Sequence, residues 1–259
     1  MSNSREMRRL QAKWQQNTGW PQRLEWLEID NLRGWAGQRI PFKFPIMAIV
    51  GENGSGKSTI LQSAASVYRP KGTSQTEEGW FASDFFPKTI WENVKDAEIR
   101  FSVRQGGRTY EDSVRKPGER WRGNPERPER NVNYIDLRRI QPIAARVGYS
   151  KLAKDAMRET SATHFDKERL ARFSQIMGWD FESARMAVTD ADAKRLVPVL
   201  SQRGLTYSGY HSGSGETTIA EFIRVDPNQY GLVIIDEIET SLHPRAQRRL
   251  IRDLGVVIK

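Results

Sequence analysis

The stretch "GENGSGKST", Gly51 to Thr59, decides the fold, because it satisfies the pattern G-x-x-x-x-G-K-[ST]. The apolar run "PIMAIVG" (Pro45 to Gly51) precedes it and predicts a buried strand. The run "STILQSAASVY" (Ser58 to Tyr68) follows it with helical spacing of apolar and small residues. Glycines let successive backbone N–H groups face one anion, and the helix N-terminus adds its dipole. The stretch therefore predicts a phosphate-binding loop between a strand and a helix.

A loop of this composition is expected to hold a nucleoside triphosphate. Lys57 supplies a positive charge for the β- and γ-phosphates, and the Ser58 hydroxyl is the expected Mg²⁺ ligand. Thr59 is expected to help hold the α-phosphate. The loop contacts the phosphates and not the base, so this motif alone does not distinguish ATP from GTP. The predicted nucleotide-binding residues of this loop are Asn53, Gly54, Ser55, Gly56, Lys57, Ser58 and Thr59.

A second chemical motif is "GLVIIDEIETSLHP", Gly231 to Pro244, in which β-branched residues end in two adjacent carboxylates. Such an apolar strand is typical of a parallel sheet covered on both faces, and ligands bind at the carboxyl ends of such strands. Asp236 is predicted to hold Mg²⁺ directly or through water. Glu237 is predicted to be the catalytic residue that polarises the attacking water, with Lys57 assisting. The alternative makes Glu237 a solvated strand-end residue.

Composition narrows the class of protein. The 259 residues carry a formal net charge of +9 and a pI of about 9.8, a balance compatible with a nucleic-acid partner. The absence of cysteine excludes disulfides and thiolate metal sites. No run approaches the roughly 18 apolar residues of a membrane span, and the charged N-terminus lacks the apolar core of a signal peptide. We expect a cytoplasmic protein with no membrane association.

Secondary structure follows from the periodicity of the remaining segments. Helices are predicted at 4–17, 149–157, 165–178, 181–188, 217–224 and 244–254. Strands are predicted at 24–30, 39–44, 97–103, 108–116, 132–137 and 230–236. The proline-rich stretch 117–130 is predicted to be a loop. The interval between Lys57 and Asp236 is much longer than compact ring-forming ATPases need, so it must contain a sub-lobe.

These residues resemble the ABC-type ATPase head found in SMC, RecF and OLD-family proteins. The opening "LEWLEIDNLRGW…RIPFKFPIMAIVGENGSGKST" is similar to that group's order of strand, N-x-R, strand and phosphate loop. "DEIETSLHP" resembles the Walker B and D-loop of the OLD-like branch, written DEPExxLHP. The resemblance covers about residues 22–70 and 205–254. It implies an α/β P-loop NTPase of ABC type, with ATP as the nucleotide and a mixed or parallel central sheet flanked by helices.

The same resemblance, with the element pattern, suggests how the chain is divided. Residues 1–21 form a basic N-terminal extension, and residues 22–103 form the first part of the ATPase core, with an N-terminal antiparallel β part. Residues 104–204 form an insert containing a hairpin, an arginine-rich loop and a helical sub-lobe. Residues 205–259 complete the core, and here the chain is expected to be truncated.

The glycine-rich stretch "HSGSGETT" (His211–Thr218) lies where the family places its signature motif, S-x-G-E/Q at a helix start. In the family, two heads stack so that each signature contacts the γ-phosphate on the partner's phosphate loop. Matching Glu216 to E/Q puts Gly215 on the motif's glycine and Gly213 on its serine position. This departure leaves open whether Ser212 or Ser214 contacts ATP. The alternative is a plain Gly/Ser loop that caps the next helix.

Three other family features are harder to locate. The loop with a metal-coordinating Gln is matched only by "ASDFFPKT" (Ala82–Thr89), with Gln141 as a weak alternative. The switch histidine follows the strand after Walker B in the family, and the chain ends before one. His243 belongs to the D-loop and is a different residue from that switch. His164 is expected near a helix start without a catalytic role.

The segment Arg104–Arg139 is rich in arginine and contains Trp121. One interpretation is a surface that contacts DNA or RNA backbone. Interspersed acids and prolines favour an ordinary solvated loop instead.

The first functional hypothesis is an ATPase head that forms a homodimer or higher oligomer around Mg-ATP and switches an attached or partner effector. OLD-like heads occur in bacterial phage defence, in Gabija- and Septu-like assemblies and often beside a nuclease, so the resemblance implies a nuclease effector. The second hypothesis is a structural module in which ATP holds an assembly together with little turnover. The third is a DNA-repair or chromosome-maintenance ATPase.

Overall fold

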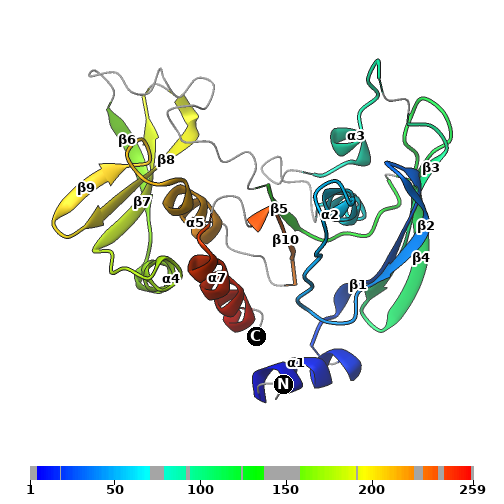
Figure 1. The fold of residues 1–259 in the computed structure, drawn as a ribbon, viewed down its shortest axis with the longest axis horizontal. Coiled ribbons are helices and arrows are strands. Elements are labelled where there is room, and N and C mark those ends of the chain that lie inside the picture. The colour runs from blue at the N-terminus through cyan, green and yellow to red at the C-terminus, as the bar shows by residue number, and fades with distance from the viewer. Residues whose placement is uncertain are drawn as a thin grey trace. The chain divides into compact units, whose positions relative to one another are not determined.

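The protein was analysed as a computed structural model, which describes residues 5–17, 19–70, 79–91, 94–123, 125–136, 158–190, 192–224, 230–238 and 242–257. The chain divides into two compact units (Figure 1). The first comprises Met1–Tyr134 and Pro227–Ile234, and the second comprises Ile135–Asp226 and Ile235–Lys259. Each unit contains strands and helices, so the mixed α/β class predicted from the sequence is confirmed.

The first unit is built on a four-stranded antiparallel sheet of order β2-β1-β3-β4. Its strands are β1 (Gln22–Leu32), β2 (Trp35–Pro41), β3 (Ala97–Gln105) and β4 (Arg108–Lys116). The predicted hairpin of 97–116 is confirmed as β3 and β4. Alternate residues of β1 and β3 are buried, among them Leu27, Ile29, Ile99 and Phe101, as the period of a strand requires. Helix α2 (Lys57–Ser66) packs against this face through Ile60, Ala64 and Ala65.

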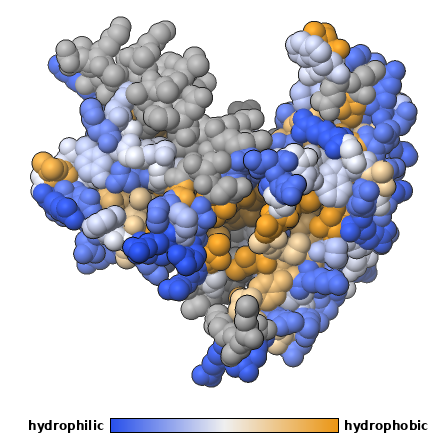
Figure 2. Space-filling view, in the orientation of Figure 1, coloured by the Kyte–Doolittle hydropathy of each residue, from blue (hydrophilic) through white to orange (hydrophobic). Residues whose placement is uncertain are grey.

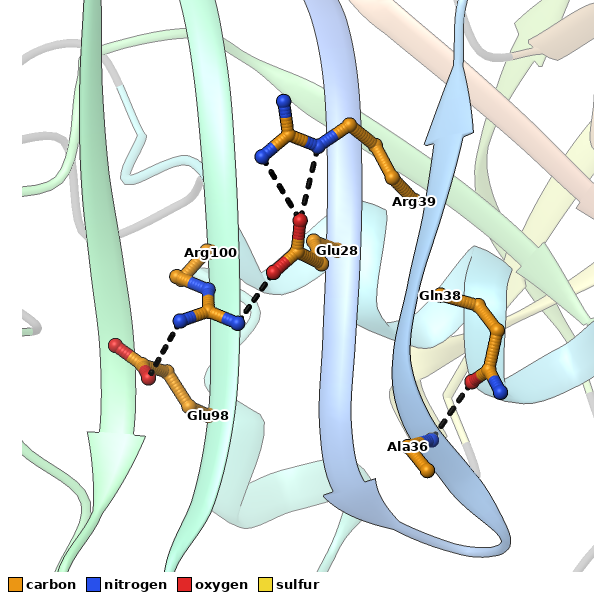
Figure 3. A network of polar contacts seen from close by, with 6 residues as sticks. All are labelled: Glu28, Ala36, Gln38, Arg39, Glu98 and Arg100. Atoms are coloured by element: carbon orange, nitrogen blue, oxygen red, sulfur yellow. Dashed lines mark hydrogen bonds and ion pairs between the residues drawn. The ribbon is translucent and has the colours of Figure 1, made fainter.

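The other face of this sheet carries a row of ion pairs (Figure 3). Glu28 of β1 accepts a hydrogen bond from Arg39 of β2 at 2.9 Å and from Arg100 of β3. Arg100 also pairs with Glu98 at 3.6 Å. Arg39 lies over the ring of Trp26 at 3.8 Å, which adds a cation–π contact. These contacts cross three neighbouring strands and fix their register on the solvent side.

Shorter elements complete the first unit. They are α1 (Arg5–Gln15) and α3 (Ala82–Phe85). The strands β5 (Val132–Asp136) and β10 (Leu232–Asp236) form a two-stranded sheet, and the boundary between the units falls within both strands, after Tyr134 and after Ile234. The predicted basic helix at 4–17 is confirmed as α1. Arg23 joins it to β1 by donating to the Trp14 carbonyl at 2.8 Å and lying over the Trp14 ring.

The second unit holds another four-stranded antiparallel sheet, of order β6-β7-β8-β9. Its strands are β6 (Glu159–His164), β7 (Ser183–Thr189), β8 (Asp192–Gln202) and β9 (Leu205–Ser208). Helix α5 (Ser214–Arg224) contacts β7 and β8. Helix α4 (Lys167–Met177) contacts α5 and α7 (Pro244–Val257). The predicted helices at 165–178, 217–224 and 244–254 are confirmed as α4, α5 and α7.

Two sequence predictions about these elements are wrong. The segment 181–188 is not a helix, because Ser183–Thr189 alternates buried and less buried residues as β7. The expected helical sub-lobe is therefore largely a β-sheet over the described residues 158–208. The run Pro45–Gly51 is not a buried strand either, since it is irregular and Val50 is 89% exposed. The predicted helix at 149–157 lies outside the described residues.

The single central sheet implied by the resemblance is not formed by the residues that the structure describes, whose strands fall into two antiparallel sheets and the β5–β10 pair. No helix in the described ranges combines the length and the apolar character needed to cross a bilayer.

Candidate functional site

The phosphate loop Gly51–Thr59 leads directly into α2, whose first residue is Lys57. Gly54 and Gly56 adopt left-handed conformations with φ of 81° and 88°, which side chains disfavour. These glycines bend the loop so that the chain enters the helix with its N–H groups at the loop. Residues 51–55 are exposed, whereas Thr59 and Ile60 are buried on the sheet. The predicted arrangement of a glycine loop at a helix N-terminus is therefore present.

The side chain of Lys57 folds back over its own loop. Its Nζ donates to the carbonyl oxygens of Gly51 at 2.8 Å and Glu52 at 2.9 Å. These two contacts hold the ammonium group against the backbone of the loop, although a lysine side chain is flexible. An ammonium placed here adds a point charge to the N–H groups of the helix start, which suits a phosphate.

Trp35, at the start of β2, closes one side of the loop. A Cβ atom at position 56 would lie 2.5 Å from Nε1 of Trp35, so only glycine fits between the loop and this ring. Position 51 is similarly crowded by the Ser55 hydroxyl, at 2.7 Å from where a Cβ would lie. Glycine is therefore favoured at position 56 by both its φ and the Trp35 ring, whereas at position 51 the Ser55 hydroxyl could rotate away from an added Cβ. Trp35 lies outside the phosphate-loop motif in the sequence, so its contact with the loop is visible only in the structure.

The N-x-R motif of the opening segment also has a structural role in the first unit. Asn31 donates to the Lys95 carbonyl at 3.0 Å. Arg33 donates to the Gln62 side chain of α2 and to the Phe85 carbonyl of α3, each at 3.1 Å, and lies over the Phe86 ring. Both residues have positive φ, as a tight connection between β1 and β2 demands. The motif thus fixes α2, and with it the phosphate loop, to the sheet.

Two arginines of the proline-rich stretch are buried beneath the loop helix. Arg127 is 2% exposed and donates to the carbonyls of Ser66, at the last turn of α2, and of Trp80. Burial lowers the pKa of Arg127 to about 10. Cationic donors suit the end of a helix, where carbonyl groups lack partners. The interpretation of 104–139 as an entirely solvated loop is therefore wrong at Arg127.

Arg130 plays a related part at the start of β10. Its guanidinium donates to the carbonyls of Tyr230 at 2.8 Å and Gly231 at 3.2 Å, and to the Tyr68 hydroxyl. Tyr68 is buried, and burial raises its pKa. Arg130 therefore connects the segment after α2 with the strand that carries the acidic pair. The burial of these two arginines could not be predicted from composition, because the proline-rich stretch 117–130 is polar along its length.

The acidic pair lies at the carboxyl end of β10, as predicted. Asp236 is the last residue of the strand and is 3% exposed. Glu237 follows it with φ of 59°, a left-handed conformation that costs a glutamate roughly 1 kcal/mol or more. Unusual backbone of this kind is concentrated at functional sites. The residues that hold the loop, Ser58 and Lys57, belong to the first unit, and Asp236 and Glu237 belong to the second.

The donor types suit magnesium. A serine hydroxyl and a carboxylate are hard oxygen ligands, and Mg²⁺ is usually held by only one or two protein groups beside phosphate and water. Within the described ranges no group of three or more His, Asp or Glu side chains gathers to hold a metal by itself.

The stretch His211–Thr218 forms the start of α5. Ser212 is turned inward, because its hydroxyl shares a hydrogen bond with that of Thr217 at 2.9 Å. Ser214 opens the helix and is exposed, and its hydroxyl has no hydrogen-bond partner among the described residues. Gly213 and Gly215 flank it. The two candidate serines therefore differ in their availability to a ligand.

Glu216, three residues into this loop–helix junction, is held by two donors. One oxygen accepts from the Gly213 N–H at 2.9 Å, which closes the first turn as in a capping box. The other accepts from the Tyr207 hydroxyl at 2.7 Å. Burial, then the neighbouring Glu216, raises the pKa of Tyr207 well above its ordinary value. Glu216 is thus a residue that shapes the signature stretch, and Tyr207 was missed from the sequence.

The remaining candidates lie as follows. "ASDFFPKT" contains the short helix α3, whose Asp84 caps the Phe81 N–H, and Gln141 lies outside the described residues. His243 accepts from the Arg245 N–H at 3.3 Å at the start of α7, a capping contact. His164 is exposed at the end of β6, just before α4.

Comparisons with known proteins give one result on family. A family model described as an AAA domain matches residues 27–176, which is more than half of the chain and includes the phosphate loop. A search of curated proteins finds no match.

Proposed function

The chain belongs to the AAA-domain family, whose members are nucleotide-binding ATPases, and on this premise we propose that it is an ABC-type head that binds and hydrolyses ATP. The observation that carries the proposal is the phosphate loop, with Lys57 held over the Gly51 and Glu52 carbonyls at the start of α2. The family model covers this loop, so the sequence motif, the local geometry and the family support the same function.

We further propose the division of labour within the site. The loop N–H groups and Lys57 bind the β- and γ-phosphates, and Ser58 and Asp236 hold Mg²⁺. Bound Mg²⁺ would neutralise charge on the phosphate oxygens. Glu237 accepts a hydrogen bond from the attacking water and positions it in line with the γ-phosphate. The strained backbone of Glu237 supports this role, because it fixes the carboxylate immediately after a buried strand end.

A homodimer around two nucleotides is part of the proposal. The exposed Ser214 hydroxyl at the start of α5 supports it, since a helix N-terminus with a free hydroxyl is suited to the γ-phosphate on a second copy. The first test uses light scattering of the Glu237→Gln variant, which should trap ATP, with and without Mg-ATP. A doubling of mass with ATP is expected, and a strict monomer would remove the dimer from the account.

The resemblance to OLD-like heads extends the proposal to a biological setting. We infer that the dimer switches a partner or attached effector, a nuclease being the candidate, in defence against phage. Challenge of cells that carry the chain with its genomic neighbours tests this. Protection that disappears with Lys57→Ala is expected, and protection that persists would show that the nucleotide site is not the switch.

Phosphate release with and without DNA separates the other hypotheses. Release that is stimulated strongly by DNA would favour a repair or chromosome-maintenance ATPase. ATP-dependent dimerisation with no release would favour an assembly module held together by ATP.

A further inference from the structure

Helix α7 carries an unusual concentration of arginine. Arg245, Arg248, Arg249 and Arg252 follow one another at spacings of three and four residues, which places them on one side of a helix. The four side chains line a single shallow hollow of about 260 Å³. In Figure 2 the surface over α4 and α7 is hydrophilic. This face is outside every motif assigned to the nucleotide.

The cluster is costly for the helix that carries it. Like charges at i, i+4 destabilise a helix by a few tenths of a kcal/mol per pair, and Arg245 lies in the first turn, where the helix dipole disfavours a cation. By contrast, Arg39 and Arg100 are both paired with Glu28. Because the four positive charges destabilise the helix, their presence on one side of it favours a role in binding a negatively charged ligand.

In the described part of the chain, none of the four arginines forms an ion pair. The acid of this helix, Asp253, is buried and engaged by Arg172 of α4, with N–O distances of 2.9 to 3.3 Å. Arg249 donates to the Met177 carbonyl at the end of α4 and so fixes the floor of the hollow. Arg245, Arg248 and Arg252 are exposed, and their guanidinium groups have no hydrogen-bond or ion-pair partner among the described residues.

We propose that this arginine face of α7 binds the phosphate backbone of a nucleic acid. The four residues extend over roughly 10 Å along the helix, at 1.5 Å per residue, a length that meets two or three successive phosphates of one strand. Guanidinium groups match phosphate oxygens in bidentate geometry. Among the described residues only the four arginines line the hollow, so the proposed contact is with the phosphate backbone and not with the bases or with acyl chains.

The test compares two variants with equal loss of charge. Arg248→Ala/Arg252→Ala removes two exposed arginines of the face and leaves Arg249 in place. Arg108→Ala/Arg120→Ala removes two exposed arginines of the segment 104–139 and is the matched control. Binding of the full chain to a labelled duplex and to a labelled single strand is measured by fluorescence anisotropy over a salt series. ATP binding and thermal unfolding confirm that each variant is folded.

The α7 variant should lose on the order of tenfold in affinity, and its log K against log salt slope should fall by about 1 per arginine removed. The probe that wild type binds more tightly, single strand or duplex, shows which form of nucleic acid the face prefers. The control variant should bind as wild type does. Equal losses in both variants, no binding by wild type, or displacement by polyglutamate at equal charge would overturn the proposal. Because the helix loses a repulsive pair, its unfolding temperature should not fall.

Discussion

At the scale of single residues, the phosphate loop depends on positions where a side chain cannot be placed. Gly56 combines φ of 88° with the ring of Trp35 at contact distance from any added Cβ. We therefore expect a side chain at position 56 to disturb the loop. The ring that enforces the restriction comes from β2, well separated in sequence.

Gly56→Ala should therefore lower ATP affinity by tenfold or more, since a left-handed alanine costs about 1–2 kcal/mol before the ring is displaced. Isothermal titration with ATP measures the change. Gly106→Ala is the matched control, because Gly106 has φ of 61° in open space and lies in the β3–β4 turn. Gly106→Ala should lower the stability of the protein, because alanine is strained at this φ, but it should leave the ATP affinity unchanged. Normal ATP binding by Gly56→Ala would contradict the loop geometry.

The two serines of the signature stretch give a second prediction at this scale. Ser214→Ala should reduce kcat for phosphate release by about 100-fold, the effect of removing one donor to a developing charge. Ser212→Ala should mainly lose its hydrogen bond to Thr217, a stability effect of about 1 kcal/mol. Steady-state kinetics and thermal unfolding of both variants separate the effects. A larger kinetic loss in Ser212→Ala would reverse the assignment.

At the scale of elements, α2 is held at both ends. Its N-terminus carries the loop, and its last turn is bound by Arg127. Arg127→Ala should destabilise the protein by about 2–4 kcal/mol, because two buried carbonyls lose a charged donor. Urea unfolding provides the measurement. Arg120→Ala, an exposed arginine of the same stretch, should change stability by less than about 0.5 kcal/mol. Equal effects would show that Arg127 is not an anchor.

The outer face of the first sheet gives a pH prediction. The hydrogen bond from Arg39 and the charge of Arg100 lower the pKa of Glu28 below its ordinary value. A carboxylate whose pKa is lower when folded stabilises the protein above its unfolded pKa and loses this contribution as the pH falls through the folded value. Glu28→Gln should cost about 1 kcal/mol at pH 7 and less as the pH falls below about 4. Urea unfolding at several pH values tests this, and a pH-independent difference would contradict it.

The limits of the sequence analysis also appear at the scale of elements. Helices α5 and α7 and strand β10 were predictable, since their apolar periodicity agrees with their flanking residues. Strand β7 was not, because "SARMAV" is rich in helix-forming Ala, Met and Arg, and tertiary pairing with β6 and β8 overrides that propensity. The strand predicted at Pro45–Gly51 is absent because an apolar segment forms a strand only where a neighbouring strand is available to pair with it.

The candidate site likewise contains residues that could be predicted from the sequence and residues that could not. Lys57, Ser58, Asp236 and Glu237 could be proposed from the sequence because their motifs are local in sequence. Trp35, Arg127 and Tyr207 act through contacts between distant segments, which one sequence without its fold does not reveal. The positive φ of Glu237 is likewise visible only in the structure.

At the scale of the whole molecule, the two units divide the chemistry between them. The first carries the loop for phosphate, and the second carries the acidic strand end, the signature stretch and the arginine face of α7. The proposed hydrolysis draws on residues of both units, because Lys57 and Ser58 belong to the first and Asp236 and Glu237 to the second.

The most direct measurement is phosphate release from Mg-ATP by wild type and Glu237→Gln, with ATP affinity measured on the same samples. Wild type should release phosphate, and Glu237→Gln should bind ATP as tightly while releasing phosphate at least about 100-fold more slowly, because it lacks only the group that positions water. Equal release by the two proteins, or no ATP binding by wild type, would contradict the assignment of this chain as an ATPase that uses Glu237.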